Sequence, residues 1–336
     1  MKKQISILGF LLLSSIAQAQ ITIQTTVKGY GNRVGIGYWK NLTYNEDTLQ
    51  LNMNKASFKL DSSIPIYFKF RTIDPDTYTP FFMAFPGDII AIEKDSDHFT
   101  IKGGAESYNR FLIKTDSEMR AAFTGKRLDY NATTKYLLDR SEEFFSSFNY
   151  PNKQMLKDLY TLSVITNYKL YPIISKYNND TSKMNGLFQL LRNQKRSSND
   201  DDILKYIDQV NFNNPNMGYA SMSDIIMMNN FIMILRTQAI KKDSTLRDID
   251  EYIIDNRLIK DLFKESRYRS RLLAYNLYSR IESYTQYPML LAQVNDFIDD
   301  FRKEEFSSEL TPPIEKLYAS QLSTIGALAK GAIAPA

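Results

Sequence analysis

The 336-residue chain contains no cysteine and a single histidine, His98. Without a thiolate, these residues cannot carry out thiol–disulfide exchange or form a thiolate metal site, and one imidazole argues against a histidine-based metal site. The Gly-x-Ser-x-Gly turn of a serine nucleophile is also absent. Because His98 follows Asp95-Ser96-Asp97, we interpret it as an exposed histidine in a turn, and an enzyme that uses His98 as a base is the least favoured alternative.

Carboxylates are abundant, but their pattern does not indicate catalysis or calcium binding. Acidic neighbours such as Glu142-Glu143 are local doublets, whereas a glycosidase needs two carboxylates that face each other across a cleft. The run Asp200-Asp201-Asp202 is interpreted as the cap of a following helix, where acidic groups suit the helix dipole. We therefore predict no catalytic residue, no metal site and no cofactor, and we expect this chain by itself not to be an enzyme.

The sequence also lacks a long apolar run in its main part and an excess of charge of one sign. Without residues 1–19, 40 Lys and Arg balance 38 Asp and Glu, and the two signs are interspersed. A nucleic-acid-binding protein needs a concentrated basic face, so we expect no nucleic-acid partner.

The most apolar stretch, Ile225–Leu235, is shorter than the roughly 20 residues that cross a bilayer. It favours a buried helix, and we expect no stable membrane span in the mature chain.

What is present at the N-terminus is the three-part pattern of a secretory signal peptide. Lys2 and Lys3 precede the short apolar stretch Ile5–Ile16, and Ala17-Gln18-Ala19 has the small-x-small form of a cleavage site. We therefore predict a signal peptide over residues 1–19, cleaved after Ala19. No cysteine follows it, which excludes a lipid anchor of the bacterial lipoprotein type. The expected location is the periplasm, with secretion as the alternative.

Residues 20–105 have the pattern of a β-rich domain. Short β-branched or alternating runs are separated by Gly, Asn, Asp and Pro, as in an antiparallel sandwich or barrel. These runs are Ile21–Ile23, Thr25–Val27, Leu49–Leu51, Phe58–Leu60, Ile66–Phe70, Ile89–Ile92 and Phe99–Ile101. The nearby glycines from Gly29 to Gly37 are not followed by Gly-Lys-Ser/Thr, so we interpret them as turns and strand bulges and not as a phosphate loop.

Residues 106–322 have a helical period instead. Phe144, Phe145 and Phe148 share one stripe, and the Pro312-Pro313 pair is expected to stop or start a helix. The predicted fold class is therefore α+β: an N-terminal antiparallel β-sandwich or barrel-like domain followed by an irregular helical bundle.

One segment within the β-rich part has a more specific order. Phe81–Ile92 contains the turn Pro86-Gly87-Asp88, and Phe99–Gly104 and Asn109 follow it. In such a turn, proline fixes the first φ angle, glycine accepts a positive φ and aspartate bonds back to the backbone. This order resembles the β-rich N-terminal domain of envelope proteins of the TlpA-like thioredoxin family.

The resemblance implies a function that depends on a further domain. In proteins of that kind, a helical segment and then a thioredoxin-like domain with Cys-x-x-Cys follow. Gly331–Pro335 looks like the Gly-x-x-Ala-Pro opening of that domain, so residues 323–336 are expected to be a linker stub toward a thioredoxin-like domain that is missing here. The chain would then be the non-catalytic accessory region of an exported thiol–disulfide oxidoreductase, serving in positioning, dimerisation or substrate selection.

The alternative is a stand-alone envelope binding module for a peptide, a glycan or a partner protein. Its first candidate contact residues are the single tryptophan, Trp39, and the neighbouring Tyr38 and Tyr44. The expected partners are proteins or peptides, the alternative also leaves a glycan open, and a homodimer is compatible with either hypothesis.

Overall fold

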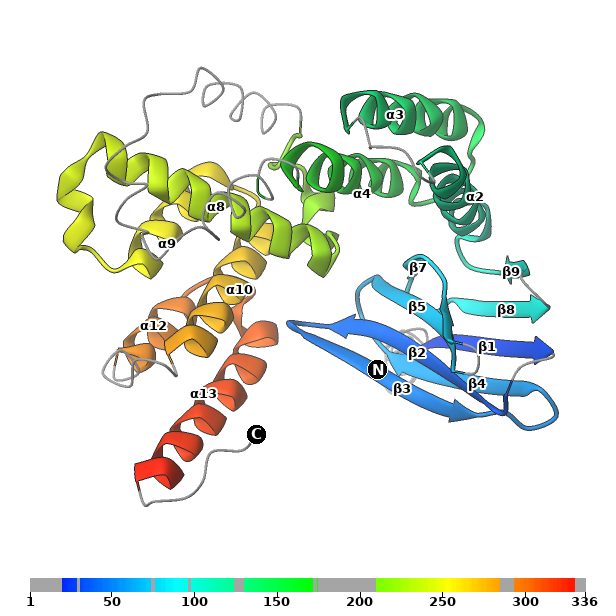
Figure 1. The fold of residues 1–336 in the computed structure, drawn as a ribbon, viewed down its shortest axis with the longest axis horizontal. Coiled ribbons are helices and arrows are strands. Elements are labelled where there is room, and N and C mark those ends of the chain that lie inside the picture. Colours follow the sequence, from blue (N-terminus) through cyan, green and yellow to red (C-terminus); the bar gives the residue numbers. More distant parts are fainter. Residues whose placement is uncertain are drawn as a thin grey trace, which may run out of the picture. The chain divides into compact units, whose positions relative to one another are not determined.

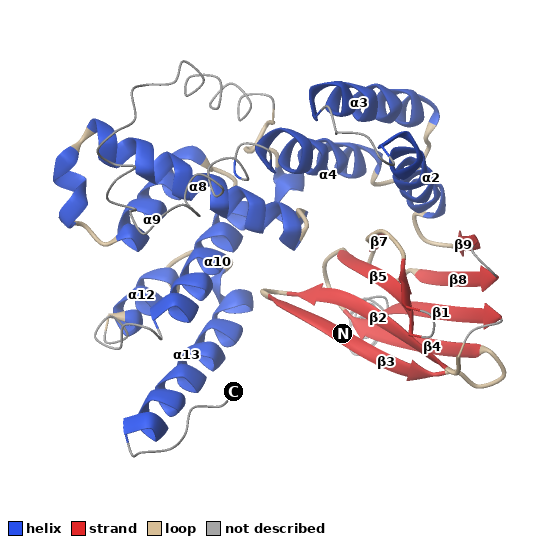
Figure 2. Cartoon of the chain, viewed as in Figure 1, coloured by secondary structure: helices blue, strands red, loops and turns tan. Residues whose placement is uncertain are grey.

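The computed structural model describes residues 20–28, 31–73, 76–95, 98–123, 130–171, 174, 210–284 and 293–329. Strands occupy the first part of the chain and helices the rest, so the predicted α+β class is confirmed (Figures 1 and 2). The predicted signal peptide, Asp200–Asp202 and Gly331–Pro335 lie outside the described residues. The chain divides into two compact units, the first with residues up to 128 and 144–153, the second with 129–143 and 154 onward.

The first unit contains two sheets. All neighbouring strands are antiparallel except β1 and β8, which are parallel. The four-stranded sheet has the order β4 (Lys55–Asp61), β1 (Gln20–Lys28), β8 (Ile89–Asp95), β9 (His98–Lys102). The five-stranded sheet has the order β3 (Thr43–Gln50), β2 (Arg33–Lys40), β5 (Ile66–Ile73), β6 (Asp76–Tyr78), and β7 (Phe82–Ala84) also pairs with β5.

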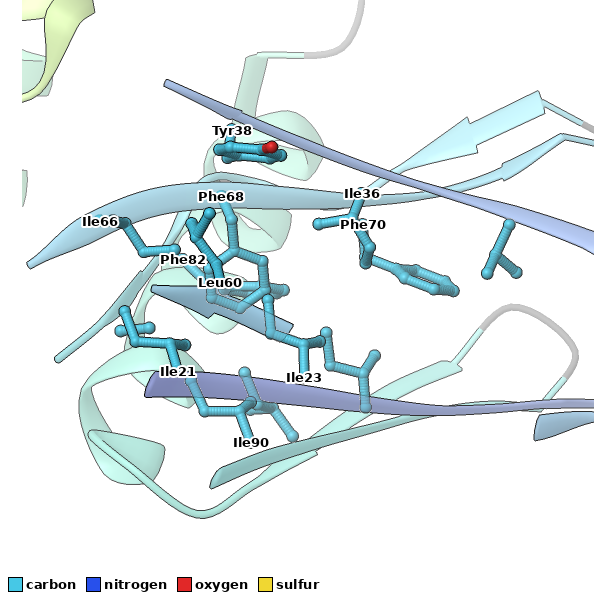
Figure 3. Packing of buried hydrophobic residues seen from close by; sticks show 14 of the residues in the cluster. Ile21, Ile23, Ile36, Tyr38, Leu60, Ile66, Phe68, Phe70, Phe82 and Ile90 are labelled. Atoms are coloured by element: carbon cyan, nitrogen blue, oxygen red, sulfur yellow. The ribbon is translucent and has the colours of Figure 1, made fainter. Parts of the chain in front are cut away.

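A single apolar core lies between these two sheets. Ile21, Ile23 and Ile90 of the four-stranded sheet pack against Phe68 and Phe82 of the other (Figure 3). All five side chains are at most 1% exposed, and the two phenylalanine rings meet edge to face at 5.6 Å. Burying one such side chain contributes about 1.5–3 kcal/mol. The core therefore makes this domain a sandwich of two sheets.

The turn Pro86-Gly87-Asp88 has the predicted geometry. The Asp88 amide donates to the Phe85 carbonyl at 2.9 Å, and Gly87 has φ 89°. The Asp88 carboxylate accepts from the Phe85 amide at 2.8 Å, which is the predicted bond back to the backbone. Burial raises the pKa of Asp88. The Asp88 carbonyl then accepts from the Thr22 amide at 2.9 Å, so the turn sets the register of β8 beside β1.

The passage from the last strand to the first helix depends on a glycine. Gly103 has φ 83°, and its amide donates at 3.0 Å to the carboxylate of Glu106, the first residue of helix α2 (Glu106–Phe123). A Cβ atom on Gly103 would lie 2.2 Å from the backbone oxygen of Ile89, which cannot move without disturbing β8. Both the positive φ and this close approach require glycine.

We expect Gly103→Ala to lower the free energy of unfolding by about 2–3 kcal/mol, because it adds both strain and a backbone clash. Gly35→Ala is the matched control, since its Cβ would lie 3.1 Å from a flexible carboxylate oxygen of Glu46. Urea unfolding followed by Trp39 fluorescence measures both losses. Equal losses for the two variants would show that the turn at Gly103 imposes no special constraint.

Aromatic packing joins α2 to the chain around residue 145 within the first unit. Phe111 stacks on Phe144 at 4.4 Å, and Phe145 meets Phe148 edge to face at 5.7 Å. Phe144 and Phe145 lie in the last turn of helix α3 (Tyr130–Ser147), and Phe148 follows it directly, so the predicted phenylalanine stripe does pack as a group.

The second unit is helical and is organised around α10 (Ser266–Tyr284), which packs against α8, α9, α12 and α13. The other α-helices described for this unit are α4 (Lys153–Ile165), α8 (Met222–Lys242), α9 (Glu251–Leu262), α12 (Val294–Phe301) and α13 (Ser307–Ala329). The Tyr130–Glu143 part of α3 also belongs to it, whereas the first residue of α4 belongs to the first unit. Short π and 3-10 helices cover Thr166–Leu170, Pro215–Tyr219 and Ser244–Asp248. None of the described helices is both long enough and apolar enough to cross a membrane.

Two expectations for this unit have different outcomes. Ile225–Leu235 lies in α8, and its side chains at Ile225, Met228 and Phe231 are fully buried, which confirms the buried helix. The expected break at Pro312-Pro313 is wrong, because both prolines lie inside α13. Proline has no amide hydrogen, so the carbonyls four residues earlier, those of Ser308 and Glu309, receive no hydrogen bond from the helix. Both residues are exposed, so water can bond to these carbonyls.

Candidate ligand-binding face

The three predicted contact residues do not share one surface. Tyr38 and Trp39 are adjacent in β2, so their side chains point to opposite faces of the sheet. The Tyr38 ring is 8% exposed and packs in the core at 5.4 Å from the Phe58 ring. Its hydroxyl donates to the Asp47 carboxylate at 3.0 Å, and burial together with Asp47 raises the pKa of Tyr38 to about 12. Tyr38 is therefore a core residue of the sandwich.

Trp39 and Tyr44 do come together, on the outer face of the five-stranded sheet. They are directly opposite each other in the β2–β3 register. Their ring centroids are 5.4 Å apart at an interplanar angle of 64°, an edge-to-face arrangement. Tyr44 is 37% exposed.

Gly37 determines how the Tyr44 ring lies. A Cβ atom on Gly37 would be 1.9 Å from the Tyr44 hydroxyl oxygen, so the missing side chain leaves the space that this ring occupies. The turn or bulge interpretation is wrong for Gly35 and Gly37, because both are in regular register with β3 and β5. Because neither glycine has a side chain, the neighbouring side chains can lie directly against the backbone on this part of the outer face.

Two residues that the sequence did not indicate extend this surface. The Lys69 ammonium lies 5.2 Å from the centroid of the Tyr44 ring and 5.7 Å from that of Phe81, within range of cation–π attraction to both. Phe81 is 37% exposed. We call Trp39, Tyr44, Lys69 and Phe81 the outer aromatic face.

An ion pair flanks the outer aromatic face. Arg71 and Glu46 approach to 2.5 Å beside Gly35, and both side chains are partly exposed. The face thus combines exposed rings with one cation and a neutralised pair. This combination can hold apolar and polar parts of a ligand by stacking and hydrogen bonding, and it contains no pair of groups suited to acid–base catalysis.

The other candidate chemistry does not form a site in the described part of the chain. No cluster of His, Asp and Glu there could hold a metal ion. His98 begins β9 opposite Asp95, and the structure does not describe its side chain. The buried Asp224 accepts from the Thr166 hydroxyl at 2.6 Å, which ties α8 to the π-helix, and from the hydroxyl of Ser221, the N-cap residue of α8, at 2.7 Å. Burial raises the pKa of Asp224.

Comparison with known proteins adds no relative. No known family model matches the chain, and no curated protein matches it.

Proposed function

We propose that this chain is the non-catalytic accessory region of an exported thiol–disulfide oxidoreductase and that it holds a polypeptide partner on the outer aromatic face. The observation that carries the proposal is the Tyr44 ring, which lies over Gly37 next to Trp39 and Lys69. Tyr and Trp are the side chains most suited to protein recognition, because they offer a large rigid surface with a polar tip.

The link to thiol–disulfide oxidoreductases is supported by the segment that carries the resemblance. Its turn at Pro86-Gly87-Asp88 sets the β1–β8 register, and its glycine at Gly103 opens α2. Asn109 then connects that helix to β7. The residues of the resemblance thus have structural functions that belong to one folding unit.

Binding can be tested with the intrinsic fluorescence of Trp39, the only tryptophan. We expect a carboxymethylated, unfolded polypeptide to change this fluorescence in a saturable way. Tyr44→Ala and Phe81→Ala should each weaken binding about 10-fold, since a lost ring contact is worth about 1–1.5 kcal/mol. Ile89→Ala is the control: Ile89 is 61% exposed but belongs to the four-stranded sheet, so affinity should stay unchanged.

Two outcomes would overturn the proposal. A response to oligosaccharides with none to the polypeptide would make the face a glycan-binding site. Equal losses for Ile89→Ala and Tyr44→Ala would show that the outer aromatic face is not the binding surface.

A further inference from the structure

The four-stranded sheet ends in β4, whose outer edge is open over most of its length. β4 is the terminal strand of the order β4-β1-β8-β9 (Figure 1). At the start of this edge, Asn52 exchanges two backbone hydrogen bonds with Lys55, at 2.8 and 2.9 Å. Beyond Lys55, none of the described strands pairs with the outer side of β4. The edge is therefore available to a further strand from Ser57 onward.

The register with β1 shows which backbone groups reach this edge. The Val27 amide donates to the Asn54 carbonyl at 2.9 Å, and hydrogen-bonded pairs alternate along an antiparallel ladder. The even-numbered residues of β4 therefore bond to β1. The amides and carbonyls of Ser57, Lys59 and Asp61 point outward, and no described residue forms a hydrogen bond with them.

The open edge carries two charges of opposite sign. Lys59 and Asp61 are two residues apart, so both side chains lie on the outer face of the sheet, and both are exposed. Within the described part of the chain Lys59 forms no ion pair, and Asp61 is bonded only by the neutral amide of Gln20, at 3.1 Å. A lysine on an edge discourages an added strand unless that strand places an acidic residue opposite it.

Most ways of adding a second copy of the chain to this edge meet an obstacle. Outward groups pair with outward groups, so a two-fold axis can pass beside any residue of the open stretch. An axis beside Ser57 or Phe58 would bring the other copy into the place that Asn52 occupies next to β4. An axis beside Lys59 or Asp61 would place identical charges opposite each other, which is destabilising.

An axis beside Leu60 avoids both obstacles. It places Lys59 of each copy opposite Asp61 of the other, so an opposite-charge pair forms twice, each time between residues whose backbone groups bond to each other. Leu60, which is 8% exposed, would lie opposite Leu60 of the other copy on the core side of the sheet. Phe58 on the same side is only partly buried, so the second strand would also cover apolar surface.

We infer that two copies of this chain associate through β4, in antiparallel pairing about a two-fold axis beside Leu60, so that their four-stranded sheets become one continuous sheet. A strand of unrelated sequence would need an acidic and a basic residue at the matching positions, whereas the second copy supplies both by symmetry. The inference is independent of the proposed function, because the outer aromatic face lies on the other sheet.

Sedimentation velocity of the full chain over a series of concentrations tests the inference, and we expect a dimer. Lys59→Asp and Asp61→Lys each place like charges opposite each other twice, so each should weaken dimerisation about 10-fold. Combining the two substitutions exchanges the charges and should restore the native affinity. Lys55→Asp is the matched control, because Lys55 is an exposed lysine of the same strand that lies outside the paired stretch.

Three results would overturn the inference. The first is a native chain that stays monomeric at every concentration. The second is a charge-exchanged double variant that keeps the native circular dichroism spectrum but dimerises no better than the single variants. The third is a dimer that Tyr44→Ala dissociates, since this would place the interface on the outer aromatic face. A dimer that behaves as expected while Tyr44→Ala leaves polypeptide binding unchanged would support the inference and contradict the proposed function.

Discussion

Replacing Asn109 with alanine should lower the free energy of unfolding of the first unit by about 3–5 kcal/mol. Asn109 is fully buried in α2, and its amide group bonds the backbone of Met83 twice. The Met83 amide donates to Asn109 Oδ1 at 3.0 Å, and Asn109 Nδ2 donates to the Met83 carbonyl at 3.0 Å. Alanine would leave both backbone groups buried without a partner, and each such group costs about 1–3 kcal/mol.

Ser117→Ala is the control for this loss, because Ser117 is an exposed residue of the same helix and should change stability by less than about 0.5 kcal/mol. Trp39 fluorescence during urea unfolding reports on this unit, since the tryptophan is in β2. A loss below about 1 kcal/mol for Asn109→Ala would mean that Asn109 does not fasten α2 to β7.

Replacing Arg236 with methionine should destabilise the helical unit by about 3–5 kcal/mol at pH 8. The Arg236 guanidinium lies 2.5 Å from the carboxylate of Asp255 and 3.0 Å from that of Glu251, joining α8 to α9. Arg236 is 7% and Asp255 2% exposed. Methionine would fill the space but leave the Asp255 charge buried without its nearest cation.

The loss should shrink as the pH falls. Burial raises the pKa of Asp255 to about 6, although Arg236 and Arg280 act to lower it. The folded state thus binds a proton more tightly than the unfolded state, where the pKa is about 3.9. Asp255 therefore favours folding most below about pH 4, and this contribution falls by about 3 kcal/mol as the pH rises through 6. Without Arg236, the buried Asp255 charge has less compensation, so the folded state depends more on the protonated, uncharged form of Asp255. Arg236→Met should therefore lose less stability at pH 5 than at pH 8.

Arg302→Met is the matched control, because Arg302 pairs with Asp299 and Glu315 at an exposed position. Such a pair contributes at most about 1 kcal/mol. Thermal unfolding followed by circular dichroism at the two pH values measures both variants. A loss for Arg236→Met that is the same at pH 5 and pH 8 would contradict the account of Asp255.

Local chemistry explains what the sequence predicted correctly. The turn at Pro86-Gly87-Asp88 depends on residues within four positions of each other, and both the positive φ of Gly87 and the backbone hydrogen bond of Asp88 agreed with the prediction. The β-sandwich and the buried helix around Phe231 follow from hydrophobic periodicity, which is also local. Tyr38 could have been assigned to the core from sequence, because neighbours in a strand face opposite sides.

Long-range register explains what the sequence did not indicate. Gly37 is beside Glu46 and Lys69 only because β2 pairs with both β3 and β5. Lys69 joins Tyr44 through these same pairings, Phe81 is brought beside Lys69 by the pairing of β7 with β5, and neither residue has a local motif. The Asn109 bonds to Met83 cross 26 residues of chain and likewise depend on the tertiary fold.

Hydrogen–deuterium exchange of the full chain, with and without an unfolded polypeptide, tests the central claim that the β-sandwich domain holds such a partner. The account predicts that exchange slows in fragments covering residues 33–50 and 66–84, which contain the outer aromatic face. Slowing confined to residues 222–329, or no slowing in either fragment of the β-sandwich under saturating polypeptide, would contradict it.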